Sequence, residues 1–504
     1  MVDPDSGLAI AQVAMAGRAQ LEAAVESAAD AVASTAWPSS ERAATLHAAA
    51  DQVADAAERF ARLIAAEGIK TIREARSEVS RAAHTLRLSA GAVHGLTGSV
   101  PQADDRPNTA GWRSAVRVGP VGVVAAITPY NDPLNLVAHK VGPALAAGNA
   151  VFVKPDPRTP LSALLLAQVL VDCGVPTGFL SVLPANRDIA SALVADPRVR
   201  FVSFTGGRRT GALVQKAAGV RRTLMELGGV CPTILFDDAD LDVAIPALVS
   251  GAYGAAGQNC IHVQRILVHG ELYETTRSRL VEAINQVHCG PKMSENSQMG
   301  PLIDATALDR VSRMVNQAVE AGARILTGGV TDGPRYLPTL IEKVPHQTAL
   351  AREEVFGPVA TLEPFSTPDE AISLANRGGG GIHAGLFTSR REITDRLCAA
   401  LDVGGVVIGG TSDNRSDALP FGGTGSAGVG REGRDLRSCR HDGNQDLADP
   451  AHHLMRHAVK HDSQLLQASG TIVLCSQIFD VSTLCRRGVH YAGNIATHHP
   501  VESR

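Results

Sequence analysis

Short apolar runs alternate with helix-periodic stretches along most of this chain, and that alternation limits the possible folds more than any other feature. Between residues 133 and 226 the segments are apolar runs at 150–153, 180–183 and 199–204 and helical stretches at 162–171 and 211–218. Strands that alternate with helices predict a parallel sheet covered by helices. We therefore expect an α/β domain in this part of the chain.

A second series of the same kind runs from residue 233 to about 408. Its strand candidates are 233–236, 266–268, 325–326 and 406–408, and its clearest helix is 307–321. A single hydrophobic core stops growing at about 250–300 residues, and this chain has 504. The sequence thus predicts an α/β fold with two parallel-sheet domains in tandem.

The part of the chain before the first series has a different character. Residues 18–92 are rich in alanine, with apolar residues three or four positions apart, which is typical of amphipathic helices. Residues 98–107 are polar and turn-rich, and 116–127 is a β-branched run broken by glycine and proline. A strand or hairpin that leads into a buried strand is expected there.

Composition excludes several classes of function. The formal net charge is −4 without a large basic patch, which argues against nucleic-acid binding. No stretch approaches the ~18 consecutive apolar residues of a membrane span. The first residues carry no secretory signal, so we expect a cytoplasmic protein. The eight cysteines show neither a C-x-x-C pair nor metal spacing with histidine, which indicates reduced thiols and no metal site.

A glutamate and a cysteine near the middle of the chain indicate chemistry. Glu226 lies in MELGG (225–229) and Cys260, 34 residues later, in GQNC (257–260). A thiolate can attack an aldehyde carbonyl, and a carboxylate can take a proton from the water that hydrolyses the resulting thioester. These motifs alone leave an alternative open, in which Cys260 is a buried small hydrophobe and Glu226 lies at a solvated helix end.

Five further motifs accompany this pair, in order along the chain. They are residues 128–131 (TPYN), 148–155 (GNAVFVKP), 204–207 (FTGG), 353–358 (EEVFGP) and 420–423 (PFGG). With MELGG and GQNC they resemble the aldehyde dehydrogenase superfamily from roughly residue 2 to residue 433. The resemblance implies an aldehyde dehydrogenase-like fold with a Rossmann-like cofactor-binding domain (1–98 and 120–227), an oligomerisation hairpin (99–119) and a catalytic domain (228–433).

The resemblance also implies a reaction, the oxidation of a small aldehyde to a carboxylic acid through a thiohemiacetal and a thioester. Cys260 matches the family nucleophile and Glu226 its general base. Asn131 matches the residue whose amide, with the Cys260 backbone N–H, forms an oxyanion hole, although an asparagine after Pro129 also suits a turn. Glu432 matches a proposed proton relay, with a structural role equally open. A homodimer or homotetramer is expected for the family.

The cofactor that the resemblance implies is NAD or NADP. Lys154 matches a contact to the adenosine ribose, Glu354 one to the nicotinamide ribose, and Phe356 packs nearby. Gly206 falls at a helix N-terminus that meets the pyrophosphate. Taken alone, Lys154 also fits a lysine at a strand end and Glu354 a solvated acid. Further cofactor contacts are expected from three residues of the matching motifs, Thr128, Pro129 and Leu227.

The sequence departs from the family pattern at four places. Gly207 stands where many members have a serine that binds the pyrophosphate, and Arg208 offers a substitute donor. Pro157 stands where members that prefer NAD often have a glutamate, so the choice between NAD and NADP is open. Gly425 replaces a frequent lysine, and the glycines at 378–381 replace an aromatic residue.

Other segments admit more than one interpretation. Residues 423–428 match the dinucleotide fingerprint G-x-G-x-x-G by letters, but no βαβ unit surrounds them, and we interpret them as a flexible loop near the substrate mouth. Segments 131–145 and 257–265 resemble the branch that oxidises small hydroxylated or anionic aldehydes such as lactaldehyde or phosphonoacetaldehyde. His139 and His262 are candidates for substrate contact, although lone histidines are more often structural.

The resemblance ends at residue 433, and the segment 434–504 does not fit it. Eight of the 17 histidines lie there. The codons permitted for 441–446, read one base later, can encode a segment similar to the family's terminal strand. We therefore expect a frameshift just after residue 433, with a divergent extension as the alternative. Loss of the terminal strand, which in the family pairs with the hairpin, would expose strand edges.

Two other functions remain open on sequence grounds. One is a member that transfers the acyl group to coenzyme A instead of water, which Glu226 disfavours. The other is a catalytically silent binding protein, which the atypical tail and the departures at 207 and 425 suggest.

Overall fold

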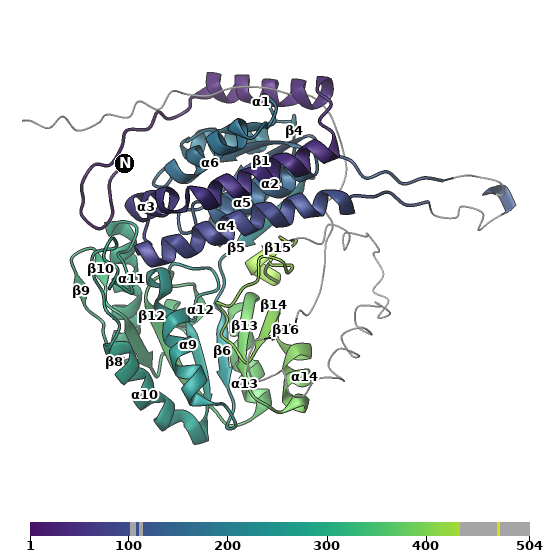
Figure 1. The fold of residues 1–504 in the computed structure, drawn as a ribbon. Coiled ribbons are helices and arrows are strands. Elements are labelled where there is room, and N and C mark those ends of the chain that lie inside the picture. Colours follow the sequence, from purple (N-terminus) through teal and green to yellow (C-terminus); the bar gives the residue numbers. More distant parts are fainter. Residues whose placement is uncertain (101–106, 110–113, 434–470, 474–504) are drawn as a thin grey trace, which may run out of the picture.

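The computed structural model describes residues 1–100, 107–109, 114–433 and 471–473. These residues form two α/β units, each built on its own sheet, which Figure 1 shows one above the other. The predicted fold class, two parallel-sheet α/β domains in tandem, is confirmed. In the described part of the chain, no helix is long and apolar enough to cross a membrane.

The first sheet has the strand order β15-β5-β4-β1-β2-β3, and all of these strands except β15 run parallel. Every residue of the central strand β1 is buried, because helices cover both faces of such a sheet. The strands predicted at 150–153, 180–183 and 199–204 are β2, β3 and β4. The bounds are β1 (Val123–Ile127), β2 (Ala150–Lys154), β3 (Leu180–Val182), β4 (Val199–Gly206), β5 (Arg222–Leu227) and β15 (Gly428–Val429).

The helices of the first unit include the predicted alanine-rich series. One of them, α4, begins with a capping box, in which the Thr71 hydroxyl accepts from the Glu74 N–H and the Glu74 carboxylate accepts from the Thr71 N–H. The helices are α1 (Arg18–Ser34), α2 (Ser39–Asp55), α3 (Ala57–Glu67), α4 (Ile72–Ala92), α5 (Asn135–Ala146), α6 (Leu161–Asp172), α7 (Arg187–Ala195) and α8 (Arg208–Ala218), with 3-10 turns η1 (Val93–Gly95) and η2 (Pro107–Thr109).

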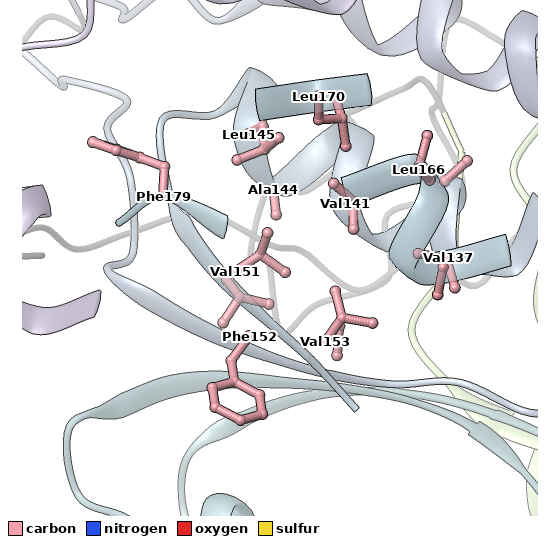
Figure 2. Packing of buried hydrophobic residues seen from close by; sticks show 14 of the residues in the cluster. Val137, Val141, Ala144, Leu145, Val151, Phe152, Val153, Leu166, Leu170 and Phe179 are labelled. Atoms are coloured by element: carbon pink, nitrogen blue, oxygen red, sulfur yellow. The ribbon is translucent and has the colours of Figure 1, made fainter. Parts of the chain in front are cut away.

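Packing of α5 and α6 around β2 holds the first sheet rigid. The side chains that meet there are Val137, Val141, Ala144 and Leu145 of α5, Val151 and Val153 of β2, and Leu166 and Leu170 of α6 (Figure 2). All of them are buried. Because each buried valine or leucine stabilises the fold by about 1.5–3 kcal/mol, the strand that ends at Lys154 has a fixed position.

The second sheet has the strand order β16-β14-β13-β6-β7-β12-β11-β8, and only the two edge strands, β16 and β8, run antiparallel to their neighbours. Its strands are β6 (Pro232–Leu235), β7 (Arg265–His269), β8 (Arg324–Thr327), β11 (Thr339–Glu342), β12 (Val359–Phe365), β13 (Gly381–Phe387), β14 (Val403–Ile408) and β16 (Thr471–Val473). A separate antiparallel pair consists of β9 (Thr331–Asp332) and β10 (Arg335–Tyr336).

Alternate residues of the second sheet point to two different cores. Ile266 and Val268 of β7 join the core that contains α9, α10 and α11, whereas Leu267 joins the core with α13 and α14. The helices are α9 (Leu241–Tyr253), α10 (Tyr273–Asn285), α11 (Ala305–Glu320), α12 (Ala349–Arg352), α13 (Pro368–Ala375) and α14 (Arg391–Ala400), with 3-10 turns η3 (Gly254–Gly257), η4 (Gly270–Leu272), η5 (Asn376–Gly378) and η6 (Gly425–Ala427).

The two units are joined by more than one crossing of the chain. After β14 the chain returns to the first sheet, where β15 pairs with β5 so that Gly428 lies opposite Glu226 and Val429 opposite Met225. The segment with the letters G-x-G-x-x-G is therefore a 3-10 turn followed by an edge strand, and not a dinucleotide-binding βαβ unit. This edge strand brings the PFGG motif next to Glu226.

The expected hairpin (99–119) and tail (434–504) lie partly outside the described residues. At the base of the hairpin, Ser99 and Val116 exchange backbone hydrogen bonds of 3.0 and 2.7 Å. Figure 1 shows these two segments leaving the first unit together as an arm. Val100 is 82% exposed on this arm. Of the tail, the structure describes only β16, whose backbone pairs antiparallel with β14 at the edge of the second sheet.

Candidate active site

Cys260 follows a sharp turn at the end of α9. Ala255, Ala256 and Gly257 have φ values of 49°, 50° and 65°, three consecutive residues in the left-handed region. This conformation is costly for the two alanines, and such strain concentrates at functional sites. A Cβ on Gly257 would lie 2.1 Å from the Gly357 carbonyl oxygen, so only glycine fits there. The turn presses the GQNC segment against the EEVFGP segment.

Gln258 anchors the cysteine loop and was not identified from the sequence. Its side chain is fully buried; Oε1 accepts from the Ile303 N–H at 3.1 Å and the Tyr130 hydroxyl at 3.2 Å, and Nε2 donates to the Pro301 carbonyl at 3.2 Å. This residue ties Cys260 to Tyr130, the neighbour of Asn131. The signal available in the sequence was a polar residue between glycine and the candidate nucleophile.

The Cys260 thiol is partly buried among charged groups. Burial raises its pKa well above the ordinary value, and the Glu354 carboxylate raises the pKa further, whereas Arg415 lowers it. The neighbouring Cys231 thiol donates to the Cys260 carbonyl oxygen at 3.5 Å. The thiol therefore needs a proton acceptor before it can act as a nucleophile.

Glu226, near the end of β5, supplies a carboxylate in the same surroundings. It is 3% exposed, and neither carboxylate oxygen has a hydrogen-bond partner among the described residues. A Cβ on Gly422 of the PFGG motif would lie 2.7 Å from Oε1, so this glycine keeps the space open. Burial, with the Glu432 carboxylate, raises the pKa of Glu226 well above its ordinary value. A buried carboxyl of this kind is suited to proton transfer.

Glu432 differs from Glu226 because it is paired. Its Oε1 accepts from Lys140 at 2.9 Å, and Lys140 also donates to Ser203 at 3.0 Å. Burial acts to raise the pKa of Glu432, but Lys140, His139 and Arg415 outweigh it and lower the pKa to about 2. Glu432 is thus an ion-paired anion beside Glu226. Its role as a proton relay stays a prediction.

A buried ionic cluster of Lys70, Glu78 and Asp132 supports the loop that carries Asn131. Asn131 is 4% exposed in the loop between β1 and α5. Glu78 Oε1 accepts from the N–H of Leu134 at 2.8 Å and of Asn135 at 3.0 Å. Lys70 donates to Glu78 at 2.8 Å and also to Asp132.

We call Lys70, Glu78 and Asp132 the support cluster. Sequence reasoning missed it, although Glu78 interrupts the apolar face of α4 that includes Ala75, Val79 and Ala82. A charged residue at such a position is a signal of a buried ion pair.

Glu354 lies against the glycines of MELGG. A Cβ on Gly228 would lie 1.9 Å from Glu354 Oε2, and Glu354 Oε1 has no partner among the described residues. Burial raises the pKa of Glu354 to about 8. Phe356, with φ at 41°, packs edge-on against Tyr130, with ring centroids 5.9 Å apart. This carboxyl group is therefore desolvated and open to a hydroxyl donor.

The predicted phosphate side is a bare helix N-terminus. Gly206 ends β4, and α8 begins at Arg208 with Gly207 as an N-cap that forms no side-chain bond. The free N–H groups of the first helical turn favour an anion. Arg208 is not the expected substitute for a serine, because its guanidinium donates to the Gly228 carbonyl at 2.7 Å and approaches the carbonyls of Gly378 and Gly380. Leu227 packs over Gly211 of α8.

Thr128 and Lys154 are neighbours at the ends of β1 and β2. The Thr128 N–H donates to the Lys154 carbonyl at 3.2 Å, and half-buried Pro129 continues the turn. Burial lowers the pKa of Lys154. Arg158 donates to Asp156 and Asp304 and stacks 4.3 Å from the centre of the Tyr130 ring, so its charge is already paired.

Two departures from the family pattern, Gly425 and the glycines at 378–381, meet in one contact between two loops. Gly425 has φ at 55°, and a Cβ there would lie 2.9 Å from the Gly379 carbonyl oxygen. A Cβ on Gly380, whose φ is 99°, would lie 2.3 Å from the Thr424 carbonyl oxygen. The two backbones touch, so a lysine at one position and an aromatic residue at the other are excluded together.

The two histidine candidates differ. His262 is buried with Nε2 3.0 Å from the Ala252 carbonyl oxygen, and burial lowers its pKa to about 4, which fits the structural alternative. His139 lies 2.9 Å from Asp417, beside Arg415. Within the described ranges, no group of histidine, cysteine and acidic residues could hold a metal ion.

Comparison with known proteins identifies relatives over most of the chain. A sequence profile of the Aldehyde dehydrogenase family matches residues 1–439. Aspartate-semialdehyde dehydrogenase 1 of Pseudomonas canavaninivorans is 42% identical over 79% of this chain and 85% of its own length. The 3-sulfolactaldehyde dehydrogenase of Priestia aryabhattai is 39% identical over 84% of this chain and 89% of its own length. The glyceraldehyde-3-phosphate dehydrogenase of Methanocaldococcus jannaschii, solved with NADP, has a TM-score of 0.82 at 32% identity, over 86% of this chain and 94% of its own.

Proposed function

The chain belongs to the aldehyde dehydrogenase family, and we propose that it oxidises a short anionic aldehyde to the carboxylic acid with Cys260 as the nucleophile. The observation that carries this proposal is the pairing of a partly buried thiol with a carboxylate that is buried and unpartnered, Glu226, at a point where glycines leave room for a ligand. The cofactor is NAD or NADP.

In the first step, Glu226 takes the thiol proton of Cys260 and the thiolate adds to the aldehyde carbon. The raised pKa of Glu226 favours this transfer, because it makes the carboxylate a stronger proton acceptor. The carbonyl oxygen becomes an oxyanion, which the Asn131 amide and the Cys260 backbone N–H stabilise. Each such preorganised donor contributes about 3–4 kcal/mol in comparable sites.

The residues on the cofactor side fit a dinucleotide. The unpartnered Glu354 oxygen suits a ribose hydroxyl, Gly228 allows its close approach, and the α8 N-terminus suits a pyrophosphate. When bound, the nicotinamide supplies the acceptor for the hydride that leaves the thiohemiacetal carbon. Cys260 then holds the product as a thioester.

Glu226 acts again in the second half of the reaction, once it has released the first proton to solvent. It takes a proton from the water that attacks the thioester carbon, the C–S bond breaks, and the acid leaves with Cys260 restored. An unpaired carboxylate is needed here, since an ion-paired one such as Glu432 holds protons too weakly.

Two arginines support an anionic substrate: Arg415, which acts on the thiol, and Arg81, which shares the partner Asp417 with it. Arg415 is 8% exposed at its side chain, stacks 3.7 Å from the centre of the Phe421 ring, and acts electrostatically on both Cys260 and Glu226. Arg81 donates two hydrogen bonds to Asp417 at 3.1 and 2.9 Å and keeps about a third of its side chain exposed. Relatives named for sulfonated and carboxylated aldehydes agree with this.

A matched pair of substrates tests the proposal. Turnover of 3-sulfolactaldehyde is compared with that of lactaldehyde, which lacks only the sulfonate, using NAD and NADP in turn. We expect kcat/KM to favour the sulfonate roughly 10–150-fold, the value of one charge-assisted hydrogen bond of about 1.5–3 kcal/mol.

Variants assign that preference to a residue. Arg81→Ala should remove most of the preference, because it should lower turnover of 3-sulfolactaldehyde far more than turnover of lactaldehyde. Arg87→Ala is the matched control, because Arg87 lies on the same helix but pairs with Asp51 at the surface. Equal turnover of both aldehydes by the parent would contradict the anionic substrate, and no turnover of either would contradict the reaction.

We also propose the division of the chain that the sequence predicts, with 1–98 and 120–227 binding the cofactor and 228–433 carrying the nucleophile. The exposed arm around 99–119 supports a role in homo-oligomerisation, since an exposed strand pair with apolar residues favours addition of another strand.

A further inference from the structure

A wide groove on the second sheet is lined by residues other than those of the proposed active site, and Arg208 of the predicted phosphate side reaches its wall at Gly378. It has a volume of about 900 Å³, which is the size of a small-molecule site. Its charged lining, which we call the basic groove, consists of Arg265, Lys343, His346, Arg352, Arg377 and Glu363.

The groove lies on the face of the sheet that packs against α13 and α14 elsewhere along its length. Along β12, Leu362 joins the core with α9, α10 and α11, so its neighbours Thr361 and Glu363 point to the opposite face. There the loop after β11, the helix α12 and the turn η5 form the walls.

Positive charge dominates the basic groove. Four permanent cations face one carboxylate, because the arginines and the lysine are opposed only by Glu363. Glu363 lies 3.4 Å from Arg265, 3.2 Å from Arg377 and 3.7 Å from His346, so its charge is shared among three partners. The groove is left with a net positive charge of about three, which attracts anions.

Arg265 is the strongest indication of a ligand. It is 4% exposed, its single contact with Glu363 is long, and its second terminal nitrogen is buried without a hydrogen-bond partner in the described structure. A buried guanidinium costs several kcal/mol unless its donors are satisfied, and its planar fork suits phosphate oxygens. The unpartnered donor belongs to a residue that lines the groove.

Two backbone features mark the rim. Lys343 has φ at 55°, a left-handed conformation that is uncommon for lysine and that turns the chain sharply at the end of β11. On the other side, Gly378 and Gly379 form the wall, and they are part of the glycine run that replaces an aromatic residue of the family. Bulky side chains are thus absent where an anion would enter.

We propose that the basic groove binds a small molecule that carries two or more phosphate groups, at a site separate from the cofactor. Arg265 forms the floor, where its free donor meets a phosphate oxygen. Arg377, Lys343 and Arg352 contribute charge from the rim. A single carboxylate or sulfonate would leave most of these cations unmatched, so a compact polyphosphate is the ligand class that fits the charge.

Calorimetric titration of the full chain with inorganic pyrophosphate tests this proposal. The titration is run at constant ionic strength, with the cofactor site filled in turn by saturating NAD and NADP. We expect binding to persist in both conditions. The double variant Lys343→Asn/Arg377→Ser should weaken it at least about tenfold, the effect of losing charge-assisted contacts of roughly 1.5 kcal/mol or more.

A control separates a specific site from general charge. Lys216→Asn/Arg59→Ser removes the same number of cations from exposed positions outside the groove and should bind as the parent does. Both doubles alter exposed residues, and circular dichroism checks their fold. The proposal is overturned if the parent does not bind pyrophosphate, if cofactor abolishes binding, or if the two doubles weaken it equally.

Discussion

This fold surrounds two pairs of buried carboxylates in opposite ways. Glu78 and Asp132 belong to the support cluster, where Lys70 bonds to both and Glu78 also receives two backbone N–H groups. Glu226 has no partner for either oxygen, and Glu354 has none for Oε1, among the described residues.

The two pairs differ in role: the support cluster holds a loop in place, and the unpaired carboxylates take part in the proposed reaction. In the support cluster, burial acts to raise the pKa of Asp132, but Lys70 and Arg81 outweigh it and lower the pKa, whereas burial raises the pKa of Glu78 although Lys70 opposes the rise. Burial of Glu226 and Glu354 is not compensated, and their pKa values rise. Leaving a buried carboxylate unpaired costs several kcal/mol. The carboxylates left in this state are those that we propose contact substrate, water and cofactor.

The largest expected effect comes from the thiol that the unpaired carboxylates surround. Cys260→Ala should reduce turnover at least ~10⁴-fold, because no other group can form the thioester, while urea unfolding changes little. Cys231→Ala, which alters the adjacent buried thiol, is the control and should keep most activity. Initial rates of reduced nicotinamide formation measure both, and substantial turnover in Cys260→Ala would assign the nucleophile elsewhere.

Removing the unpaired base is the next largest effect. Glu226→Gln should lower kcat about 10²–10⁴-fold and should also slow the burst of reduced nicotinamide, because both thiol activation and thioester hydrolysis lose their base. Stopped-flow absorbance records the burst. Restoration of steady turnover by coenzyme A would favour acyl transfer to a thiol as this enzyme's second step.

The same substitution should not weaken the fold. Because the folded pKa of Glu226 is raised, its stabilising contribution is complete below the ordinary value of 4.5 and is lost as pH rises through the raised value. At neutral pH or above, Glu226→Gln should therefore be at least as stable as the parent in urea. A loss of more than 2 kcal/mol, about the value of a broken buried pair, would contradict the contrast with the support cluster.

Breaking the support cluster should weaken the fold. Lys70→Met removes the lysine that two buried carboxylates share and should lower the free energy of unfolding by about 3–5 kcal/mol, as measured by urea denaturation. The double variant Lys70→Met/Glu78→Gln should recover part of this loss, because one of the two charges is removed. If Lys70→Met is as stable as the parent, the cluster does not hold the Asn131 loop.

The smallest effect concerns cofactor affinity and pH. The pKa of Glu354 is raised to about 8 by burial, so the group is mostly protonated at pH 7 and ionised above 8. Since a carboxylate accepts from a ribose hydroxyl more strongly than a protonated carboxyl does, the Kd of the cofactor should fall severalfold between about pH 7 and pH 9. Fluorescence titration measures it, and Glu354→Gln should flatten the dependence.

The sequence predicts the unpaired groups better than the paired ones. Cys260, Glu226 and Glu354 stand in short glycine-containing motifs. Two motif glycines have a physical reason there, since Gly228 clears space around the Glu354 carboxylate and Gly422 around that of Glu226. The alternation of apolar runs with helices likewise predicts both sheets, because that pattern follows directly from burial on two faces.

The support cluster could not be predicted, because its members meet only in three dimensions. Lys70 and Asp132 are far apart in sequence. Gln258 likewise bonds to a distant residue, Tyr130, in the loop after β1. The mutual exclusion of side chains at Gly380 and Gly425 also depends on the contact of two loops. In the sequence, Gly380 and Gly425 look like two independent losses of family side chains. In the structure they form one contact between two loops.

The prediction of a frameshift after residue 433 stays a prediction. The family profile ends at residue 439, close to that point. Resequencing the gene decides the matter: an insertion or deletion of one base near this codon is expected, and an intact reading frame would favour a divergent extension.

The strand pair between β5 and β15 has a consequence for how the protein is made. The edge partner of Glu226 is Gly428, roughly 200 residues later in the chain. While a ribosome is still synthesising the second unit, the first sheet lacks its last strand and the carboxylate of Glu226 lacks its cover. Contacts this distant in sequence form late and slowly, so a nascent chain gains its active site only after almost all of the second unit has been translated.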